Sequence, residues 1–252
     1  MNVGQMYGDL DRPPLRPAAL RRALEPDGWR LEVLAQVPST QHVIRERLAG
    51  QAQGLVVVAE EQTAGRGRLD RSWDSPPRAG LTFSGLLRPD LPVERWGWVP
   101  LLAGLAVAQA IREQTELDAV LKWPNDVLID GKKVAGLLAE VSDGAVVLGV
   151  GLNVTTRASE LPHEQATSLL LAGATMTDRE TLLKSLLRGL SGVLGDRDYA
   201  PYRALCSTLG RQVRVELPGG TSVEGLAEAV DDEGRLVVDG TAYAAGDVVH
   251  LR

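Results

Sequence analysis

The sequence contains few of the residues that build disulfides and metal sites. Its single cysteine, Cys206, excludes an internal disulfide and a zinc site made of several cysteines, and we predict that it is a small buried core residue. The three histidines, His42, His163 and His250, are scattered along the chain and match no metal-ligand spacing. We therefore expect no metal site built from side chains of this protein.

The sequence also lacks long apolar runs and an excess of basic residues. No run approaches the roughly 18 apolar residues of a membrane span, and no apolar core of signal-peptide length stands near the N-terminus. The expected location is the cytoplasm, without a membrane partner. A formal net charge of -6 argues against a general nucleic-acid binder, since such binding depends on many lysines and arginines that neutralise phosphates.

The sequence does contain a local concentration of arginine and glycine at residues 61–77, called the basic loop below. It follows the continuous apolar run 54–59, which predicts a buried strand. Alternate glycines allow a tight turn, and the arginines present fixed positive charge that matches the oxygens of phosphate or carboxylate. Trp73 adds a flat face for a base. The alternative is a solvated basic turn beside an ordinary core tryptophan.

A second stretch, residues 120–140, predicts a β-hairpin. Asp130 and Gly131 form the turn pair, because both tolerate a positive φ. Residues 122–126 place an ammonium, an amide and a carboxylate close together at the end of the first strand, and two lysines open the second strand. Surface lysines on a hairpin often only improve solubility, so this stretch alone identifies no function.

Together with the glycine-containing strand 145–154, these two stretches resemble the biotin protein ligases. The patterns GRGR-x-x-R-x-W-x-S-P-P, KWPNDV followed by GKKVAGLL-x-E, and LGVGLNV occur in the order and spacing of that family. The resemblance runs from about residue 33 to the C-terminus. It implies an α/β fold of the class II aminoacyl-tRNA-synthetase and biotinyl-lipoyl-ligase type, a mixed sheet with helices, followed by a small SH3-like β-barrel.

The expected domains are an N-terminal extension at 1–27, a catalytic domain at 28–206 and the SH3-like domain at 207–252. Within the extension, residues 1–17 are expected to lie extended over the surface, because their prolines cannot sit in a helix interior. Fewer than about 35 residues precede the first core strand, against roughly 60 for a DNA-binding domain, so the sequence favours the ligase-only form without a transcriptional role. The predicted elements are helices at 17–24, 40–49, 99–115 and 178–194, and strands at 29–37, 80–87, 212–217, 222–230, 236–238 and 248–251.

The resemblance implies an ATP-dependent ligase that activates biotin as biotinyl-5′-AMP. It then transfers the biotinyl group to a lysine of a biotin carboxyl carrier domain of an acyl-CoA carboxylase. The first step joins two anions, the biotin carboxylate and the α-phosphate of ATP, so the site must neutralise and align both. The implied small molecules are biotin, ATP and Mg2+, which arrives with ATP. No nucleic-acid partner is implied, and the expected state is a monomer or a weak homodimer.

By the resemblance, three residues carry the chemistry. Arg68 contacts biotin and the phosphate, and Lys133 lies over the carboxylate and the α-phosphate, where charge develops. Asp126 accepts the proton of the attacking lysine or holds that lysine in reach. The alternative for Asp126 is a cap on the hairpin turn. The binding residues implied by the same resemblance are Ser39, Thr40, Gln41, Gln62, Arg66, Gly67, Arg68, Arg71, Trp73, Lys122, Asn125, Lys133, Gly136 and Asn153.

Several of these binding roles have particular grounds. Ser39 is expected to open a helix as its N-cap, while the family uses a Ser-Thr-Asn stretch here to hold the ureido ring of biotin, and both roles can coexist. Gln41 stands where the family usually has asparagine, so its amide moves by about one carbon-carbon bond. Arg71 is expected to guide pyrophosphate and Trp73 to stack on adenine. The glycines of the basic loop suggest that it closes over the adenylate and excludes water.

Two other functions compete with this interpretation. A lipoate ligase of the same superfamily performs the same chemistry on a different acid, but the polar residues Ser39, Thr40 and Gln41 suit a ureido ring better than a dithiolane. A non-catalytic protein that senses biotin or a nucleotide is the second alternative. The presence of Arg68, Asp126 and Lys133 argues against it.

Overall fold

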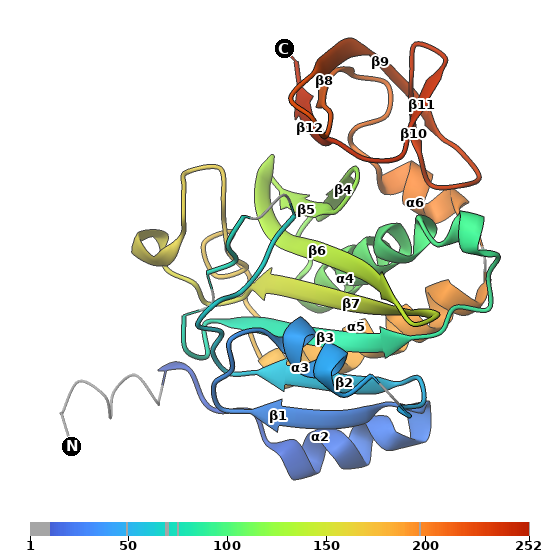
Figure 1. Ribbon diagram of the computed structural model, residues 1–252. Coiled ribbons are helices and arrows are strands. Elements are labelled where there is room, and N and C mark those ends of the chain that lie inside the picture. Colours follow the sequence, from blue (N-terminus) through green and yellow to red (C-terminus); the bar gives the residue numbers. More distant parts are fainter. Residues whose placement is uncertain (1–10, 49, 69–70, 75, 197, 252) are drawn as a thin grey trace.

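A seven-stranded mixed sheet organises the larger part of the molecule (Figure 1). The computed structural model describes residues 11–48, 50–68, 71–74, 76–196 and 198–251. The strands of this sheet are β1 (Arg30–Leu34), β2 (Leu55–Ala59), β3 (Gly80–Leu87), β4 (Val120–Lys122), β5 (Asp126–Ile129), β6 (Lys132–Ser142) and β7 (Ala145–Asn153). Their order is β1-β2-β3-β7-β6-β5-β4, in which β1 and β2 are parallel and all other neighbours are antiparallel.

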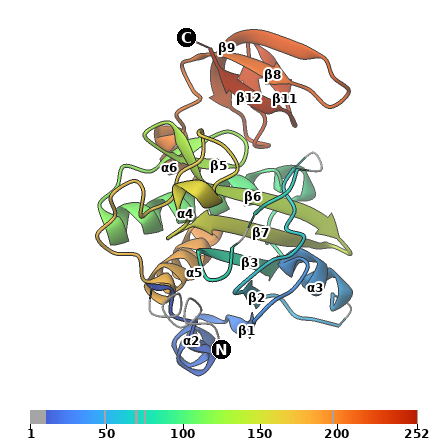
Figure 2. The same ribbon diagram turned by 90° about the vertical axis from the view of Figure 1, so that its left-hand side faces the viewer.

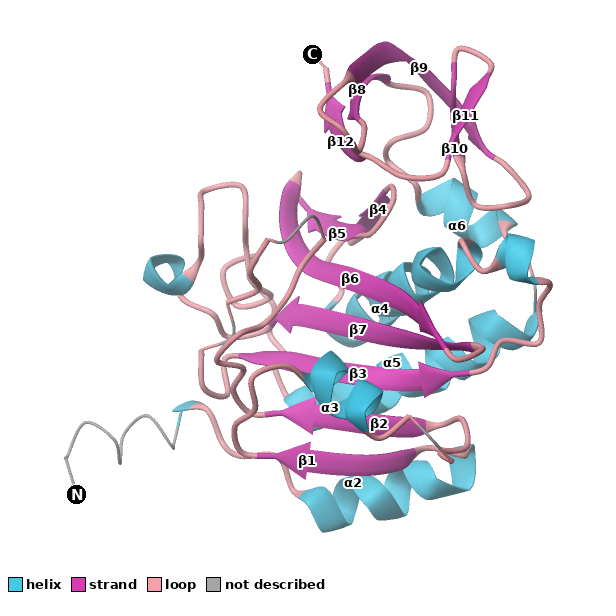
Figure 3. Ribbon diagram, viewed as in Figure 1, coloured by secondary structure: helices cyan, strands magenta, loops and turns pink. Residues whose placement is uncertain are grey.

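Helices cover the two faces of the sheet unequally. The helices are α2 (Pro17–Leu24), α3 (Thr40–Glu46), α4 (Trp98–Thr115), α5 (Arg179–Asp196) and α6 (Ala200–Leu205), with the single turns η1 (Glu25–Asp27), η2 (Val93–Arg95) and η3 (Ala158–Glu160). On β2, Val56 and Val58 belong to the large core with α2, α4 and α5, while Leu55 and Val57 pack with α3 on the opposite face. Figure 3 shows the short α3 in front of the sheet and α4 and α5 behind it. Because α3 has only 7 residues, it leaves much of its face uncovered.

The helix α4 is apolar on nearly all sides because it lies between the sheet and α5. A Cβ added at Gly104 would lie 3.4 Å from Leu121 Cδ2, so the helix approaches β4 closely. At its start, Trp98 stacks on Tyr199 with 3.9 Å between the ring centroids. No helix in the described part of the chain combines the length and apolar character needed to cross a membrane.

A five-stranded antiparallel sheet forms the C-terminal part of the molecule. It consists of β8 (Gln212–Glu216), β9 (Ser222–Val230), β10 (Leu236–Val238), β11 (Thr241–Tyr243) and β12 (Asp247–His250) in the order β11-β10-β9-β8-β12. Figure 1 shows it above the β4 and β5 end of the large sheet, and Figure 2 shows it above β5 from a second side. Trp123 joins the two parts: its backbone N–H donates to Thr208 Oγ1 at 3.1 Å and its indole Nε1 to the Gly234 carbonyl at 3.1 Å.

The structure confirms the predicted α/β class with a mixed sheet and helices, and the small C-terminal β-domain. Closure of that domain into an SH3-like barrel, and the domain boundaries themselves, stay predictions. The turn pair is confirmed, with φ of 49° at Asp130 and 74° at Gly131. Cys206 is a core residue as predicted, with 6% of its surface exposed.

The predicted elements and the structure differ in several places. The helix predicted at 40–49 ends at Glu46. The first strand of the predicted hairpin is two strands, because a turn with a cis Trp123-Pro124 bond separates β4 from β5 and Pro124 has no N–H for a strand ladder. The strand β11 was not predicted, since its 3 partly exposed residues give no hydrophobic period.

Residues 11–16, the described part of the segment before α2, are fixed to the body of the protein. Leu15 is 5% exposed and belongs to the large core. Its N–H donates to Glu60 Oε1 at 2.6 Å, and the Pro13 carbonyl accepts from Arg179 Nη2 at 2.6 Å. Residues 12–16 lie outside helices and strands and are mostly exposed, as expected of a segment extended over the surface, and Leu15 fixes the segment to the core. Residues 1–10 lie outside the described part of the chain.

Candidate functional site

A cavity of 620 Å³ opens on the sheet face that α3 leaves uncovered. Strand alternation places Thr82 and Ser84 of β3, and Gly149 and Gly151 of β7, on this face. All catalytic and binding residues predicted from the sequence line this one cavity, including both Arg68 and Lys133. The structure therefore brings together segments that are far apart in sequence, while the individual role of each residue stays a prediction.

The start of α3 forms a polar end of the cavity. The backbone N–H and the hydroxyl of Thr40 both donate to Gln62 Oε1, at 2.8 and 3.1 Å. Thr40 Oγ1 also lies 2.7 Å from Ser84 Oγ, a hydroxyl of the cavity floor. Ser39 takes the predicted N-cap position, with extended backbone at φ -157° and ψ 134°, but its side chain makes no capping hydrogen bond. Its hydroxyl is thus not used to start the helix.

Gln41 lies flat over the floor of the cavity and is only 5% exposed. Its Nε2 donates to the carbonyls of Leu138 at 2.9 Å and Val147 at 3.3 Å. A Cβ added at Gly149 would lie 2.9 Å from Gln41 Cδ, so glycine is what allows this side chain to cross β7. The additional methylene relative to asparagine carries the amide to the strand carbonyls. Since both amide hydrogens are directed to the backbone, Oε1 is the group that can accept a hydrogen bond from a ligand.

Lys133 and Asp126 form an ion pair in the middle of the cavity. Lys133 Nζ lies 2.6 Å from Asp126 Oδ1, and the two side chains are 30% and 20% exposed. The pair forms between β5 and β6 next to an irregularity in their register at Val127 and Leu128. Partial burial and a fixed partner hold the ammonium in one place, which suits a group that must meet developing negative charge.

Trp73 lies on the glycines of the floor. A Cβ added at Gly151 would lie 2.3 Å from Trp73 Cε2, and one at Gly136 would lie 3.1 Å from its Cζ3. Lys133 Nζ is 5.8 Å from the ring centroid, within cation-π distance. The Trp73 N–H donates to the Gly65 carbonyl at 2.9 Å, which closes the basic loop on itself.

Arg68 points from the basic loop toward the hairpin segment. Its Nη1 donates to Asn125 Oδ1 at 3.1 Å, and Asn125 Nδ2 donates to the Leu137 carbonyl at 2.8 Å. Burial lowers the pKa of the Arg68 guanidinium below its ordinary value, and the negative charges of Asp247 and Asp126 partly oppose this shift. An arginine stays protonated at neutral pH even so, and Arg68 therefore presents a partly desolvated positive charge.

The C-terminal sheet completes the cavity. Arg71 of the basic loop forms an ion pair with Asp247 of β12, and Glu216 of β8 also lines the cavity. At the other side of the loop, Arg66 Nη1 lies 3.5 Å from Glu140 Oε1 of β6. The basic loop thus bridges the two parts of the molecule.

His250 lies at the same C-terminal wall. Its Nε2 is 3.1 Å from Thr208 Oγ1. Burial, together with the nearby charges of Lys122 and Arg211, lowers the pKa of His250 to about 4. His250 is therefore neutral at pH 7. Lys122 lines the cavity as well. It lies opposite Asp126 in the register of the antiparallel strands β4 and β5.

A segment that we call the rim loop, residues 154–167, forms one side of the cavity through Pro162, His163 and Gln165. Asn153 is 8% exposed and holds the end of this loop, since its Nδ2 donates to the Thr167 carbonyl at 3.0 Å. In the part of the chain that the structure describes, no group of three or more histidines, cysteines or acidic residues could hold a metal ion. The cavity is therefore lined by several positive side chains, Arg68 and Lys133 among them, and by neutral hydrogen-bonding groups at the start of α3, an arrangement suited to an organic acid and a phosphate.

Comparison with known families decides which acid and phosphate to consider. A model of the biotin/lipoate A/B protein ligase family matches residues 33–156, and a model of the biotin protein ligase C-terminal domain matches residues 208–251. The chain is 46% identical to the biotin-acetyl-CoA-carboxylase ligase of Mycobacterium tuberculosis, with 97% of this chain and 98% of that protein aligned. The chain belongs to the biotin protein ligase family.

Other members of the family are similar over most of the chain. The bifunctional ligase/repressor BirA of Bacillus subtilis is 34% identical over 82% of this chain and 68% of its own length. Among solved structures, the biotin protein ligase of Aquifex aeolicus in complex with biotin and ATP is similar with a TM-score of 0.73. It is 32% identical, and the match covers 88% of this chain and 99% of that one.

Several residues that line the cavity of this biotin protein ligase fold were not predicted from the sequence. Ser84 had a signal, because hydroxyls at alternate positions of an otherwise apolar strand indicate a polar surface on one face. His163 and Asp247 had none, since they reach the cavity only through the folding of the rim loop and the C-terminal sheet. His163 and His250, which are far apart in sequence, both line this cavity.

Proposed function

We propose that this protein is an ATP-dependent biotin ligase. It converts biotin and ATP to biotinyl-5′-AMP and pyrophosphate, and then biotinylates a lysine of a biotin carboxyl carrier domain. The observation that carries the proposal is the presence of Arg68 and Lys133 in one cavity whose polar end displays Thr40, Gln41 and Gln62. The names of the relatives favour biotin over lipoate as the acid.

In the first step, the biotin carboxylate attacks the α-phosphorus of ATP and pyrophosphate leaves. Both reacting groups are anions, so their approach costs Coulomb energy that Arg68 and Lys133 offset. Gln41 Oε1 and the hydroxyls beside Thr40 would orient the ureido ring. Arg71 would meet the departing pyrophosphate. Mg2+, which arrives with ATP as part of the substrate, would neutralise the outer phosphates.

In the second step, the carrier lysine attacks the carbonyl carbon of biotinyl-5′-AMP. The new amide C–N bond forms as the C–O bond to AMP breaks, and the amine must give up a proton. Asp126 lines the cavity, and its carboxylate, now paired with Lys133 at 2.6 Å, would accept that proton or hold the incoming lysine in reach. The reaction consumes ATP, which fits the cytoplasmic location expected from the sequence.

The decisive experiment is ATP-pyrophosphate exchange in the presence of biotin or lipoate. Exchange that depends on biotin, followed by a mass increase of a purified carrier domain by one biotinyl group, supports the proposal. Exchange with lipoate alone would assign the protein to the lipoate branch. Binding of biotin and ATP without exchange or carrier modification would make it a sensor and contradict the ligase.

A further inference from the structure

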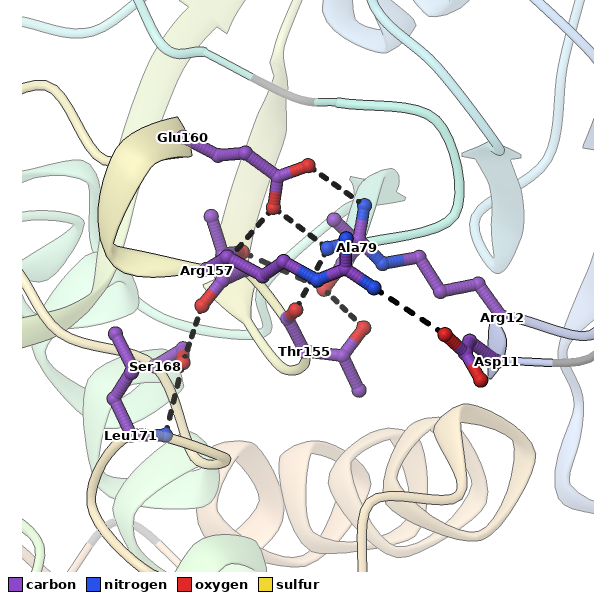
Figure 4. A network of polar contacts seen from close by, with 9 residues as sticks. Asp11, Arg12, Ala79, Thr155, Arg157, Glu160, Ser168 and Leu171 are labelled. Carbon is purple, nitrogen blue, oxygen red and sulfur yellow. Dashed lines mark hydrogen bonds and ion pairs between the residues drawn. The ribbon is translucent and has the colours of Figure 1, made fainter. Parts of the chain in front are cut away.

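Arg12 of the N-terminal strap, residues 11–16, makes three hydrogen bonds to the rim loop (Figure 4). Arg12 Nη1 donates to Glu160 Oε1 at 3.0 Å, and Arg12 Nη2 donates to Glu160 Oε2 at 2.6 Å and to the Thr155 carbonyl at 2.8 Å. The Arg12 side chain is only 13% exposed and that of Glu160 only 27%. A bidentate pair with a third bond to the backbone fixes both ends of the contact, which a simple surface ion pair does not do.

Glu160 connects Arg12 to the backbone of the rim loop. It ends the single turn η3 inside the rim loop, and its Oε2 also accepts the Arg157 N–H at 2.8 Å. The hydrogen bond from Arg12 is the largest influence that lowers the pKa of Glu160 below its ordinary value. A second bond from the strap is the ion pair between Asp11 and Arg157 at 3.3 Å. The strap therefore contacts the rim loop at the single turn η3 and at Arg157 just before it.

The strap is itself fixed to the body of the protein. Leu15 is buried in the large core and its N–H donates to Glu60 Oε1. Arg16 forms an ion pair with Glu180 of α5 at 2.8 Å. Because core contacts hold residues 13–16, Arg12 is an anchor for the rim loop and is not carried along by it.

The rim loop in turn pairs with the strand that bears Lys133. The Lys133 N–H donates to the Gln165 carbonyl at 2.8 Å, and the Lys133 carbonyl accepts from the Thr167 N–H at 2.8 Å. Asn153 holds the Thr167 carbonyl from the other side. The backbone around Lys133 is thus set by the same loop that Arg12 holds.

We propose that Arg12 is a positioning residue that keeps the rim loop in place at the half of the cavity containing Lys133 and Asn153, and thereby sets the affinity for ATP. The inference rests on the proposed function for the identity of the ligand. Arg12 touches no substrate in this scheme. Without the Arg12 side chain the rim loop opens. Part of the free energy of ATP binding is then spent on ordering the loop, and the affinity for ATP falls.

The test compares Arg12→Gln with Glu160→Gln, which breaks the same pair without altering the strap. In the full chain, amide hydrogen exchange followed by mass spectrometry should become about tenfold faster or more over residues 157–167 and at Lys133, because a charge-assisted bidentate contact is lost. The Kd and KM for ATP should rise about fivefold or more, while kcat stays within about threefold. Arg12→Lys should recover part of the affinity, and the double variant should be no worse than either single one.

Arg16→Gln is the matched control, since it removes a strap ion pair that does not involve the rim loop. It should leave exchange at residues 157–167 and the Kd for ATP within about twofold of wild type. If Arg12→Gln leaves amide hydrogen exchange at residues 157–167 unchanged, the proposal is overturned. Faster hydrogen exchange there with an unchanged Kd for ATP overturns it as well. If the wild-type protein binds ATP but shows no biotin-dependent pyrophosphate exchange, the proposed ligase is refuted. The Kd for ATP and the amide hydrogen exchange rates of the variants would still decide the role of Arg12. Wild-type protein that binds no ATP overturns both.

Discussion

Replacing Lys133 with alanine should slow biotin adenylation by about a hundredfold or more while leaving the fold intact. The ammonium is held 2.6 Å from Asp126 and 5.8 Å from the ring centroid of Trp73, so its position is fixed before substrates bind. Removal of one preorganised donor to developing charge costs about 2.7 to 4 kcal/mol of transition-state stabilisation, or roughly 10² to 10³ in rate. The variant also leaves the Asp126 carboxylate without its cation, and this repels the anionic substrates further.

The same geometry predicts a small effect on stability. With side chains 30% and 20% exposed, the pair is still reached by water, and such pairs contribute about 0 to 1 kcal/mol to the free energy of unfolding. The assay is biotin-dependent ATP-pyrophosphate exchange at saturating substrates, together with a melting curve. Lys132→Ala is the matched control, because Lys132 is exposed and is not among the residues that line the cavity. Exchange by Lys133→Ala within threefold of wild type would refute the reasoning.

Four further outcomes are expected. Arg68→Ala should form biotinyl-5′-AMP poorly or release it to water, as judged by chromatography of single-turnover mixtures, and turnover within twofold of wild type would count against its role. Biotin with ATP should slow tryptic cleavage at the arginines of the basic loop, and an unchanged digest would disprove loop closure. Gly149→Ala should weaken biotin binding because its Cβ would meet Gln41 Cδ at 2.9 Å, whereas Gly85→Ala, with nothing within 4 Å, should not. His250 has a pKa lowered to about 4 by burial, so the unfolded state takes up its proton first as the pH falls from 6.5. The free energy of unfolding should therefore decrease as the pH is lowered from 6.5 to 4. In His250→Gln the melting temperature should depend less on pH over that range.

Much of the floor of the site could be predicted because its signals are local. A β-branched run such as 54–59 predicts a strand regardless of the rest of the chain, and β2 occupies residues 55–59 of it. Alternate glycines in β7 indicate close approach of another group, and Trp73 and Gln41 make that approach. The family resemblance then placed the arginines and lysines in the site. Each of these inferences depends on residues that are close together in sequence or on a motif shared with a known family.

The walls of the cavity could not be predicted, because they depend on contacts between segments with no shared pattern. Arg71 meets Asp247, and Arg12 meets Glu160, across most of the chain. An exposed-looking arginine in a proline-rich segment has many possible acidic partners, and nothing in its neighbours selects one. The N-cap position of Ser39 shows the same limit at short range. The sequence indicated where the helix starts, but only the structure revealed that the hydroxyl makes no capping bond.

The ion pair between Arg71 and Asp247 bears on how the basic loop can move. If the loop closes over an adenylate, Arg71 must exchange a carboxylate of the C-terminal sheet for a phosphate. The Arg71 side chain is 65% exposed, so the existing pair contributes only about 0 to 1 kcal/mol. A bidentate contact with a polyanionic pyrophosphate inside the cavity is stronger than that, since charge-assisted bonds gain as water is excluded. The exchange is therefore favourable when substrate is present, which allows the C-terminal sheet to hold the loop without preventing its closure.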